Sequence, residues 1–181
     1  MKTIIRGGRV LTASSELNAD VLFENGKITQ IGTDIDIQDA NIIDASGKFV
    51  FPGGVDQHVH YSFEFKGEKV RGFETSNAAA LGGTTTVIEF VNQKKAMGLI
   101  ETINEYDKNE VRENAMVDYA FHAIITDTSV NVFDEIKKLP EHGISTVKLF
   151  MAYKGLFFHM DDDSIIQALK AGKEAGVTIM V

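Results

Sequence analysis

Residues 52–60 read Pro-Gly-Gly-Val-Asp-Gln-His-Val-His, and this stretch separates two kinds of sequence. Before it, short apolar runs are joined by tight turns. After it, apolar strand patterns alternate with helical patterns at intervals of roughly 30 residues, which is typical of successive βα units. We therefore expect an α/β chain, with a small β-sheet unit over residues 1–51 and a parallel barrel or open parallel sheet over residues 52–181.

The part before residue 52 contains the clearest turn signal of the chain. Asn25-Gly26 lies between the apolar runs 21–23 and 28–31, and both residues of the pair tolerate a positive φ, so a β-hairpin is expected. Gly7-Gly8 predicts a second turn. Further short strands are expected at residues 3–5, 10–11, 42–44 and 48–50.

The part after Pro52 predicts four βα units and the beginning of a fifth. Strands are expected at residues 54–60, 84–90, 117–126, 145–152 and 176–181. Helices are expected at residues 74–82, 99–114, 131–139 (ended by Pro140) and 161–173. A complete (β/α)₈ barrel needs about 250 residues, and the stretch beyond Pro52 is roughly half of that. We therefore expect residues 52–181 to hold only the first four to five units of a barrel.

Composition excludes several classes of protein. The 181 residues include no cysteine, which excludes disulfides and thiolate metal sites. The net charge of −8, without a run of Lys or Arg, argues against nucleic acid or an anionic membrane as a partner. The N-terminus lacks the apolar core of a signal peptide, and no stretch is long enough to cross a bilayer. A cytoplasmic location is expected.

Two histidines near the end of the first predicted barrel strand form the first candidate site. His58 and His60 are two residues apart, so on a strand their side chains share one face, which Asp56 shares as well. At the C-terminal end of a barrel strand, two imidazoles could bind one transition metal. The alternative from spacing alone is a pair of histidines on a solvated strand.

Lys148 is the second candidate, because it lies in the apolar strand pattern Thr-Val-Lys-Leu-Phe-Met at residues 146–151. A buried, unpaired ammonium is costly, so such a lysine should be neutral, paired or chemically altered. A neutral amine can add carbon dioxide and become a carbamate (N6-carboxylysine), which could bridge two divalent metals. The alternative is a lysine whose amine reaches solvent from the strand end.

Tyr153 and Lys154 follow at the start of the loop where a substrate would lie. A tyrosine hydroxyl there could donate a hydrogen bond to a developing oxyanion, and a packing role is the alternative. Phe63, Phe65 and Phe73 are candidates for an apolar pocket or for ordinary core. We expect structural roles for His122, Asp127, His142 and His159.

Four segments together carry a resemblance to a known family. They are residues 52–60, Gly82-Gly83-Thr84-Thr85, Ile88-Glu89-Phe90-Val91 and residues 147–154, which read Val-Lys-Leu-Phe-Met-Ala-Tyr-Lys. In this order and spacing they resemble the dihydropyrimidinase and hydantoinase family of cyclic amidohydrolases, over essentially the whole chain. The resemblance implies a metal-dependent (β/α)₈ TIM barrel and a small β-sandwich assembled from both chain ends, to which residues 1–51 would belong.

The resemblance implies a role for each candidate residue. His58 and His60 match the two histidines that bind the more buried metal. Lys148 matches the carboxylated lysine that bridges the two ions, which are usually zinc. Tyr153 matches the tyrosine that hydrogen-bonds the substrate and stabilises the tetrahedral intermediate. The remaining ligands of the family, two histidines and an aspartate, are expected beyond residue 181, and the full-length protein is expected to be a homo-oligomer, commonly a tetramer.

Related groups of proteins differ in features that the sequence contains. Dihydroorotases and allantoinases share the His-x-His strand, but residues 61–67 and the Met-Ala-Tyr-Lys segment favour the hydantoinase side, although a proline often found in the former stretch is missing. Dihydropyrimidinase-like scaffold proteins share the fold without the metal ligands. Retention of His58, His60 and Lys148 argues against that non-enzyme alternative.

The activity that the resemblance implies is hydrolysis of a ring C–N amide bond in a dihydropyrimidine or hydantoin. Two metals would lower the pKa of a bridging water, and Tyr153 would steady the oxyanion. The aspartate expected beyond residue 181 would carry the proton to the leaving nitrogen. The chain alone is therefore expected to be inactive. An allantoinase-like or dihydroorotase-like enzyme and a non-catalytic interaction protein are the alternatives.

Overall fold

The computed structural model describes residues 1–65, 67–70, 72–156 and 158–181. The chain divides into two compact units, Met1–Gly53 and Gly54–Val181. The division falls inside the Pro-Gly-Gly segment, two residues after the expected limit at residue 51. Within the described ranges, every helix is too short or too polar to span a lipid bilayer.

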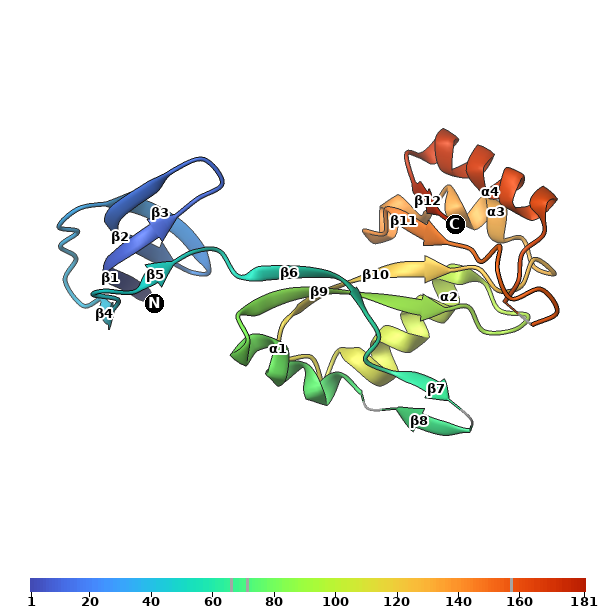
Figure 1. The fold of residues 1–181 in the computed structure, drawn as a ribbon, viewed down its shortest axis with the longest axis horizontal. Helices are drawn as coiled ribbons and strands as arrows, with labels where there is room; N and C mark the ends of the chain where they lie inside the picture. The colour runs from blue at the N-terminus through green and yellow to red at the C-terminus, as the bar shows by residue number, and fades with distance from the viewer. Residues whose placement is uncertain (66, 71, 157) are drawn as a thin grey trace. The chain divides into compact units, whose positions relative to one another are not determined.

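The first unit, Met1–Gly53, is a mixed five-stranded sheet (Figure 1). Its strands are β1 (Lys2–Leu11), β2 (Glu16–Glu24), β3 (Lys27–Gly32), β4 (Asn41–Asp44) and β5 (Phe49–Val50). β1, β2 and β3 are antiparallel neighbours, whereas β4 and β5 run parallel to β1. The hairpin between β2 and β3 turns at Asn25 and Gly26, whose φ angles are 51° and 76°, as the Asn-Gly pair predicts.

The prediction of a turn at Gly7-Gly8 is wrong, because β1 continues through these two residues with a bulge between Ile5 and Gly8. Gly7 has a φ of 70°, which favours glycine. A Cβ on Gly8 would lie 2.5 Å from Cγ2 of Val50, so β5 can approach β1 only because Gly8 has no side chain. The two glycines therefore permit a bulge, not a chain reversal.

The buried carboxylate of Asp20 hydrogen-bonds both this bulge and the segment that follows β3. Asp20 is 6% exposed. Its Oδ1 accepts from the backbone N–H of Gly7 at 2.8 Å, and its Oδ2 accepts from that of Ile35 at 3.2 Å. Nε of Arg6 lies 3.8 Å from Oδ2, and Nη2 of Arg6 donates to the carbonyl oxygen of Ile35 at 2.7 Å. Asp20 thereby joins the bulge to the segment that follows β3.

The second unit, Gly54–Val181, is built on a five-stranded sheet in the order β12-β11-β10-β9-β6 (Figure 1). Its strands are β6 (Gly54–Val59), β9 (Thr84–Asn92), β10 (Asp118–Ile124), β11 (Thr146–Lys148) and β12 (Thr178–Met180). Each strand pairs in parallel with the next one along the sheet. The order follows the sequence, so the sheet is made of successive βα units, as the alternating pattern predicts.

Helical segments connect these strands. They are η1 (Phe73–Ser76), α1 (Asn77–Leu81), α2 (Leu99–Tyr106) with the π-helical turn η2 (Asp107–Val111), α3 (Val132–Ile136), η3 (Leu139–His142) and α4 (Asp162–Ala175). Oδ1 of Asp161 caps α4 by accepting from the N–H of Ser164 at 2.8 Å, as the acidic run predicts. Pro140 does not end the preceding helix as expected, because α3 already ends at Ile136. Pro140 instead lies within η3, since a proline is tolerated in a first helical turn.

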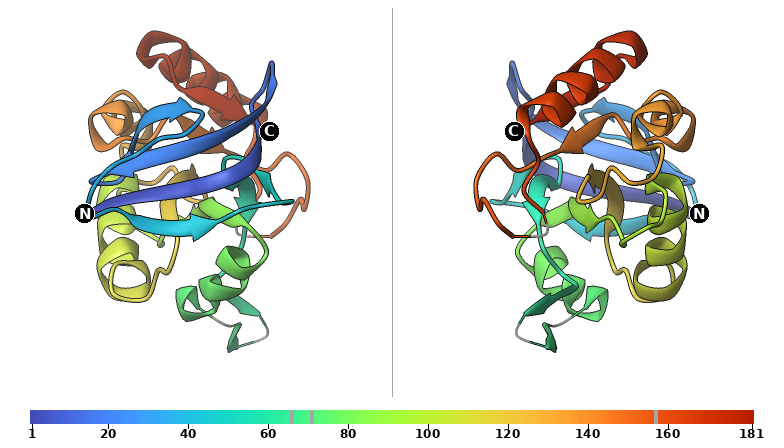
Figure 2. Two further views of the ribbon diagram at one scale, coloured as in Figure 1. Left: turned by 90° about the vertical axis from the view of Figure 1, so that its left-hand side faces the viewer. Right: turned by 90° about the vertical axis from the view of Figure 1, so that its right-hand side faces the viewer.

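Two further local features differ from the sequence-based expectation. The strand expected over residues 145–152 is only three residues long, because Phe150 instead pairs with His159 in an isolated parallel bridge. A hairpin of β7 (Phe63–Phe65) and β8 (Glu68–Val70) follows β6 and projects from the parallel sheet (Figure 2). Its turn contains Gly67 with a φ of 80°, so a Gly-based turn signal was present in the sequence.

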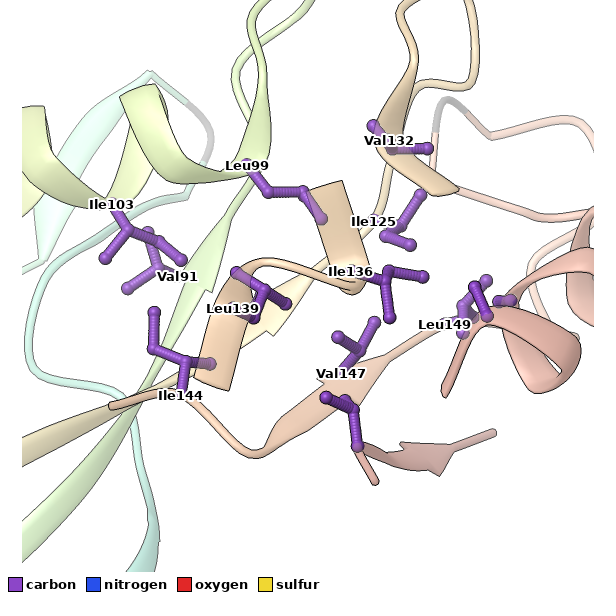
Figure 3. Packing of buried hydrophobic residues seen from close by; sticks show 14 of the residues in the cluster. Val91, Leu99, Ile103, Ile125, Val132, Ile136, Leu139, Ile144, Val147 and Leu149 are labelled. Carbon is purple, nitrogen blue, oxygen red and sulfur yellow. The ribbon is translucent and has the colours of Figure 1, made fainter. Parts of the chain in front are cut away.

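The main hydrophobic core lies between the parallel sheet and helices α2, α3 and α4 (Figure 3). It contains Val91, Ile125, Val147 and Leu149 from the strands and their extensions, packed against Leu99, Ile103, Val132, Ile136, Leu139, Ile165 and Ala168. Side chains alternate between the faces of a strand. The neighbouring residues Phe90, His122 and Lys148 therefore belong to the opposite face of the sheet.

Candidate active site

The C-terminal ends of β6, β9 and β11 bring the three predicted metal ligands together around one aromatic ring. The ring of Phe90 on β9 lies with its centroid 4.5 Å from that of His58 and 5.3 Å from that of His60. Nζ of Lys148 lies 4.5 Å from the same centroid. The two histidine rings are 5.3 Å apart. Residues 58, 60 and 148 therefore form one cluster, although β6 and β11 are three strands apart in the sheet.

A bulge in β6 sets the direction of the histidines. Asp56 pairs with Val87 and Val59 pairs with Glu89, so β6 has one residue more than β9 over this interval. Such bulges re-aim side chains and are frequent next to active sites. Oδ1 of Asp56 accepts from the backbone N–H of His58 at 3.1 Å. Strict alternation, which groups Asp56 with the histidines, therefore does not hold across this strand.

Lys148 lies at the end of β11 between two aromatic rings. Its Nζ is 5.0 Å from the ring centroid of Phe150, in addition to its contact with Phe90. The residue is half-buried, and no carboxylate of the described ranges pairs with its amine. Aromatic faces stabilise an ammonium only modestly. The surroundings therefore do not supply the counter-charge that a permanently cationic lysine would gain from a salt bridge.

The surroundings of His60 favour its neutral imidazole. The pKa of His60 is lowered, first by burial and then by the nearby positive charges of His58 and Lys148. A neutral imidazole is the form that binds a metal ion. The lowered pKa of His60 therefore favours the form of this imidazole that can bind a metal.

His122 on β10 lies beside the cluster and hydrogen-bonds residues of β6 and β11. Its ring lies 4.5 Å from that of Phe90. Nε2 hydrogen-bonds the carbonyl oxygen of Gln57 at 3.0 Å, so this nitrogen carries the proton, and Nδ1 accepts from the hydroxyl of Thr146. Burial lowers the pKa of His122. Both ring nitrogens are engaged, so His122 connects the strands of His58 and Lys148 and does not offer a free donor to a metal.

The other residues expected to have structural roles lie outside the cluster. Asp127 holds its own loop, because its carboxylate accepts from the backbone N–H groups of Ala96 at 2.8 Å and of Ser129 at 2.9 Å. His142 is exposed at the end of η3, and His159 pairs through its backbone with Phe150.

A pocket of about 490 Å³ opens beside the cluster. It is lined by His60, Phe63, Asn92, Ile124, Phe150, Tyr153 and Phe158. An aromatic pocket with a few polar groups suits a small, flat, partly apolar molecule. Of the three phenylalanines singled out in the sequence, Phe63 lines this pocket, Phe73 is fully buried in a separate core, and the side chain of Phe65 lies outside the described residues.

Tyr153 stands at this pocket with an unusual backbone. Its φ is 64°, which is rare for a bulky residue and concentrates at functional sites. The residue is 58% exposed, and its ring lies 5.2 Å from that of Phe158 and 6.2 Å from that of Phe150. The hydroxyl is thus available to a molecule in the pocket.

Sequence reasoning missed four of the lining residues, Asn92, Ile124, Phe150 and Phe158. A signal existed for three of them. Asn92 lies two residues after Phe90, Ile124 two after His122 and Phe150 two after Lys148, so alternation directs all three toward the same face as the cluster.

The donors of the cluster fit a metal site in part. Among the described residues, no group of three or more His, Cys, Asp or Glu side chains could hold a metal ion. Two imidazoles and a lysine amine are present, and the lysine becomes an oxygen donor if it is carboxylated. Imidazole nitrogen and carboxylate-like oxygen are ligands that zinc accepts. The described residues therefore supply part of a coordination shell.

Comparisons with known proteins give a consistent set of relatives. No protein-family profile matches the chain. A D-hydantoinase of Streptomyces coelicolor is 41% identical over 99% of the chain. Among solved structures, a D-hydantoinase superposes with a TM-score of 0.92 at 39% identity over 100% of the chain, and the dihydropyrimidinase of Brevibacillus agri with 0.91 at 36% over 99%. The chain spans about 40% of the length of each of the first two proteins and 39% of that of the third.

Proposed function

The chain corresponds to the N-terminal portion of the dihydropyrimidinase and hydantoinase family, and from this premise we propose that the whole protein is a metal-dependent cyclic amidohydrolase. Its reaction is the hydrolysis of a ring C–N amide bond in a dihydropyrimidine or a hydantoin. The observation that carries the proposal is the convergence of His58, His60 and Lys148 on the ring of Phe90. In this proposal the parallel sheet is the first part of a (β/α)₈ barrel.

His58, His60 and carboxylated Lys148 are the ligands that this chain contributes. Two divalent ions, zinc by resemblance, would supply hydroxide near neutral pH and polarise the ring carbonyl. Further ligands and the group that protonates the leaving nitrogen are expected elsewhere in the whole protein.

Lys148 must change chemically to fill this role. Its neutral amine nitrogen forms a bond to the carbon of carbon dioxide, one proton leaves to solvent, and the product is a carbamate with one negative charge. The absence of a paired carboxylate in the described ranges supports this step, because no salt bridge has to break when the amine reacts. The two aromatic faces stabilise the ammonium only modestly.

The pocket residues bind and orient the substrate. The rings of Phe63, Phe150 and Phe158 offer flat apolar contacts to a cyclic amide or its substituent. Tyr153 donates its hydroxyl proton in a hydrogen bond to the oxygen of the attacked carbonyl as negative charge develops there. Removal of this donor should slow the chemical step more than it weakens binding.

The first unit and the assembly belong to the same proposal. We assign residues 1–51 to a β-sandwich that other segments of the whole protein complete, and the homotetramer is the expected assembly by resemblance. Support comes from the apolar side chains that the Met1–Gly53 sheet leaves exposed, which are Leu17, Ile28, Ile31, Ile42, Ile43, Phe49 and Phe51.

The test is hydantoin and dihydropyrimidine turnover by the whole protein and two lysine variants. Lys148→Ala should lower turnover by more than about a hundredfold, because loss of a ligand costs more than loss of an outer-shell partner. Lys154→Ala is the matched control, since this exposed lysine lies six residues further along and has no assigned role. Normal turnover of Lys148→Ala contradicts the proposal. Absence of turnover and of bound zinc in the wild type favours the non-catalytic alternative.

A further inference from the structure

Glu89 is a fully buried carboxyl group that the proposed chemistry does not use. It lies on β9 with 0% of its surface exposed. It precedes Phe90, so its side chain is on the other face of the strand, the face that carries the helices. Acidic side chains are almost never fully buried without partners. The partners of Glu89 therefore indicate what it is for.

The carboxyl group of Glu89 binds the segment that follows β6. Its Oε2 accepts from the backbone N–H of Tyr61 at 2.9 Å, and the backbone N–H of Ser62 is a further donor to it. The hydroxyl of Tyr106, on α2, lies 3.3 Å from Oε1 and 3.4 Å from the carbonyl oxygen of Ser62. Three donors thus converge on one carboxylate, and Tyr106 closes the network.

Tyr61 and Ser62 are the two residues immediately after His60. Glu89 therefore fixes the backbone at the point where the chain leaves His60. Phe90, the next residue of β9, stacks on the ring of His60 from the opposite face, with an interplanar angle of 26°. Two adjacent residues of one strand thus hold His60 from two sides, Glu89 through the backbone and Phe90 through the imidazole.

We propose that Glu89 is a positioning residue for His60: through the backbone of residues 61–62 it keeps the imidazole in place for metal binding. The inference rests on the proposed metal-dependent function. His60 lies just beyond the last residue of β6, so the sheet ladder alone does not hold it. Metal ligands that are oriented by outer partners bind tighter, and loss of such partners commonly weakens metal affinity by about 10-fold to 100-fold.

Val87 offers a control for mere packing. It lies two residues before Glu89 on the same strand and the same face, and it is 0% exposed. It contacts the apolar cluster of Phe73 and Val111, and no hydrogen bond links its side chain to residues 61–62. Tyr61 and Tyr106 also pack against this cluster. Val87→Ala therefore weakens the apolar packing of the same layer while the hydrogen bonds of Glu89 to residues 61–62 remain.

Glutamine at position 89 separates hydrogen bonding from charge. Its amide oxygen accepts from the N–H of Tyr61, and its NH₂ group donates to the hydroxyl oxygen of Tyr106, which then gives its own proton to the carbonyl of Ser62. Glu89→Gln should therefore rescue what Glu89→Ala loses. Tyr106→Phe, which keeps the carboxylate and the ring, removes one donor and serves if Glu89→Ala does not fold.

The experiment compares these four variants with the wild type in the whole protein. Hydrogen exchange of the peptide that contains Tyr61 and Ser62 reports the network, and competition with a chelator reports zinc affinity. We expect Glu89→Ala to expose the two amides to exchange and to weaken zinc binding about tenfold or more. Tyr106→Phe should change both readouts in the same direction but less. Glu89→Gln and Val87→Ala should keep the wild-type zinc affinity within about threefold.

The outcomes separate the inference from the proposed function. If the wild type binds zinc and Glu89→Ala (or Tyr106→Phe) binds it no more weakly than Val87→Ala, the positioning role is refuted and the proposed function stands. If Glu89→Gln fails to rescue zinc binding, hydrogen bonding of residues 61–62 is not the cause and the inference is overturned. If the wild type binds no zinc, both the proposed function and the inference fail.

Discussion

Nε2 of His122 hydrogen-bonds the carbonyl oxygen of Gln57 at 3.0 Å, although the two residues are 65 positions apart in the sequence. The contact crosses from β10 to β6, over the intervening strand β9. Gln57 lies in the interval where β6 carries its extra residue, and it directly precedes His58. The other nitrogen of His122 engages Thr146, two residues before Lys148. One imidazole thereby links the strands that carry the candidate ligands.

Replacement of His122 should therefore be costly. His122→Ala leaves a cavity and removes both hydrogen bonds, so we expect it to lower the free energy of unfolding by about 2–4 kcal/mol. His142→Ala is the control, because that histidine is exposed, and its effect should stay within about 0.5 kcal/mol. Thermal and denaturant unfolding measure both. Equal stability of the two variants would show that the contacts of His122 contribute nothing to the free energy of unfolding.

The buried carboxyl group of Glu89 predicts a pH dependence of stability. Burial raises its pKa from 4.5 to about 7, although the hydrogen bonds from Tyr61, Tyr106 and Ser62 act in the opposite direction. The folded state therefore keeps this proton over a pH range in which the unfolded state has released it. The contribution of Glu89 to the free energy of unfolding should be greatest below about pH 4.5 and should fall as the pH rises to about 7, by on the order of 3 kcal/mol.

Comparison with Glu89→Gln isolates this effect, because glutamine does not titrate. The difference in unfolding free energy between wild type and variant, measured in metal-free protein, should change steadily between about pH 4.5 and 7 and be constant above. A difference that does not vary with pH over this window would mean that Glu89 titrates normally.

Asp20 offers a test of the first unit. Asp20→Ala leaves the N–H groups of Gly7 and Ile35 without their acceptor and removes the charge opposite Arg6, and we expect a loss of about 3 kcal/mol of stability. Asp36→Ala, at an exposed position nearby, should change stability by less than about 0.5 kcal/mol. If the unfolding midpoints of the two variants coincide, the stabilising role of Asp20 is refuted.

Tyr153 predicts a specific kinetic signature in the whole protein. Tyr153→Phe keeps the ring but removes the donor, so kcat should fall by about 100-fold to 1,000-fold while KM changes little. Tyr119→Phe is the matched control, because that hydroxyl donates to Asp107 at 2.7 Å, away from the candidate pocket. A rise in KM with unchanged kcat would assign Tyr153 to substrate binding alone.

The sequence predicts those parts of the fold that depend on local chemistry. The Asn25-Gly26 hairpin follows from the φ preferences of its two residues, and the cap of α4 follows from the acidic residue Asp161. The order of the parallel strands follows from their alternation with helices. These features need no knowledge of distant contacts, which is why pattern and turn chemistry suffice.

The remaining features depend on contacts between distant residues. The need for glycine at the bulge of β1 follows from the close approach of Val50 to Gly8, some forty residues apart. The shortness of β11 follows from the bridge of Phe150 to His159. The roles of His122 and Glu89 follow from contacts with residues on other elements. His122 contacts Gln57 on β6 and Thr146 on β11, and Glu89 contacts Tyr106 on α2. His58, His60 and Lys148 can be singled out from the sequence by residue type and position, whereas what holds them cannot.

The most direct evidence on whether His58, His60 and Lys148 hold the metal is the zinc content of the purified whole protein. It is measured by elemental analysis after equilibration with zinc and removal of the excess. We expect about two zinc ions per chain in the wild type and in Lys154→Ala, as in two-metal hydrolases. We expect a clear loss of zinc in Lys148→Ala and in the double variant His58→Ala/His60→Ala. Full zinc content in both of these variants would contradict the claim that His58, His60 and Lys148 hold the metal.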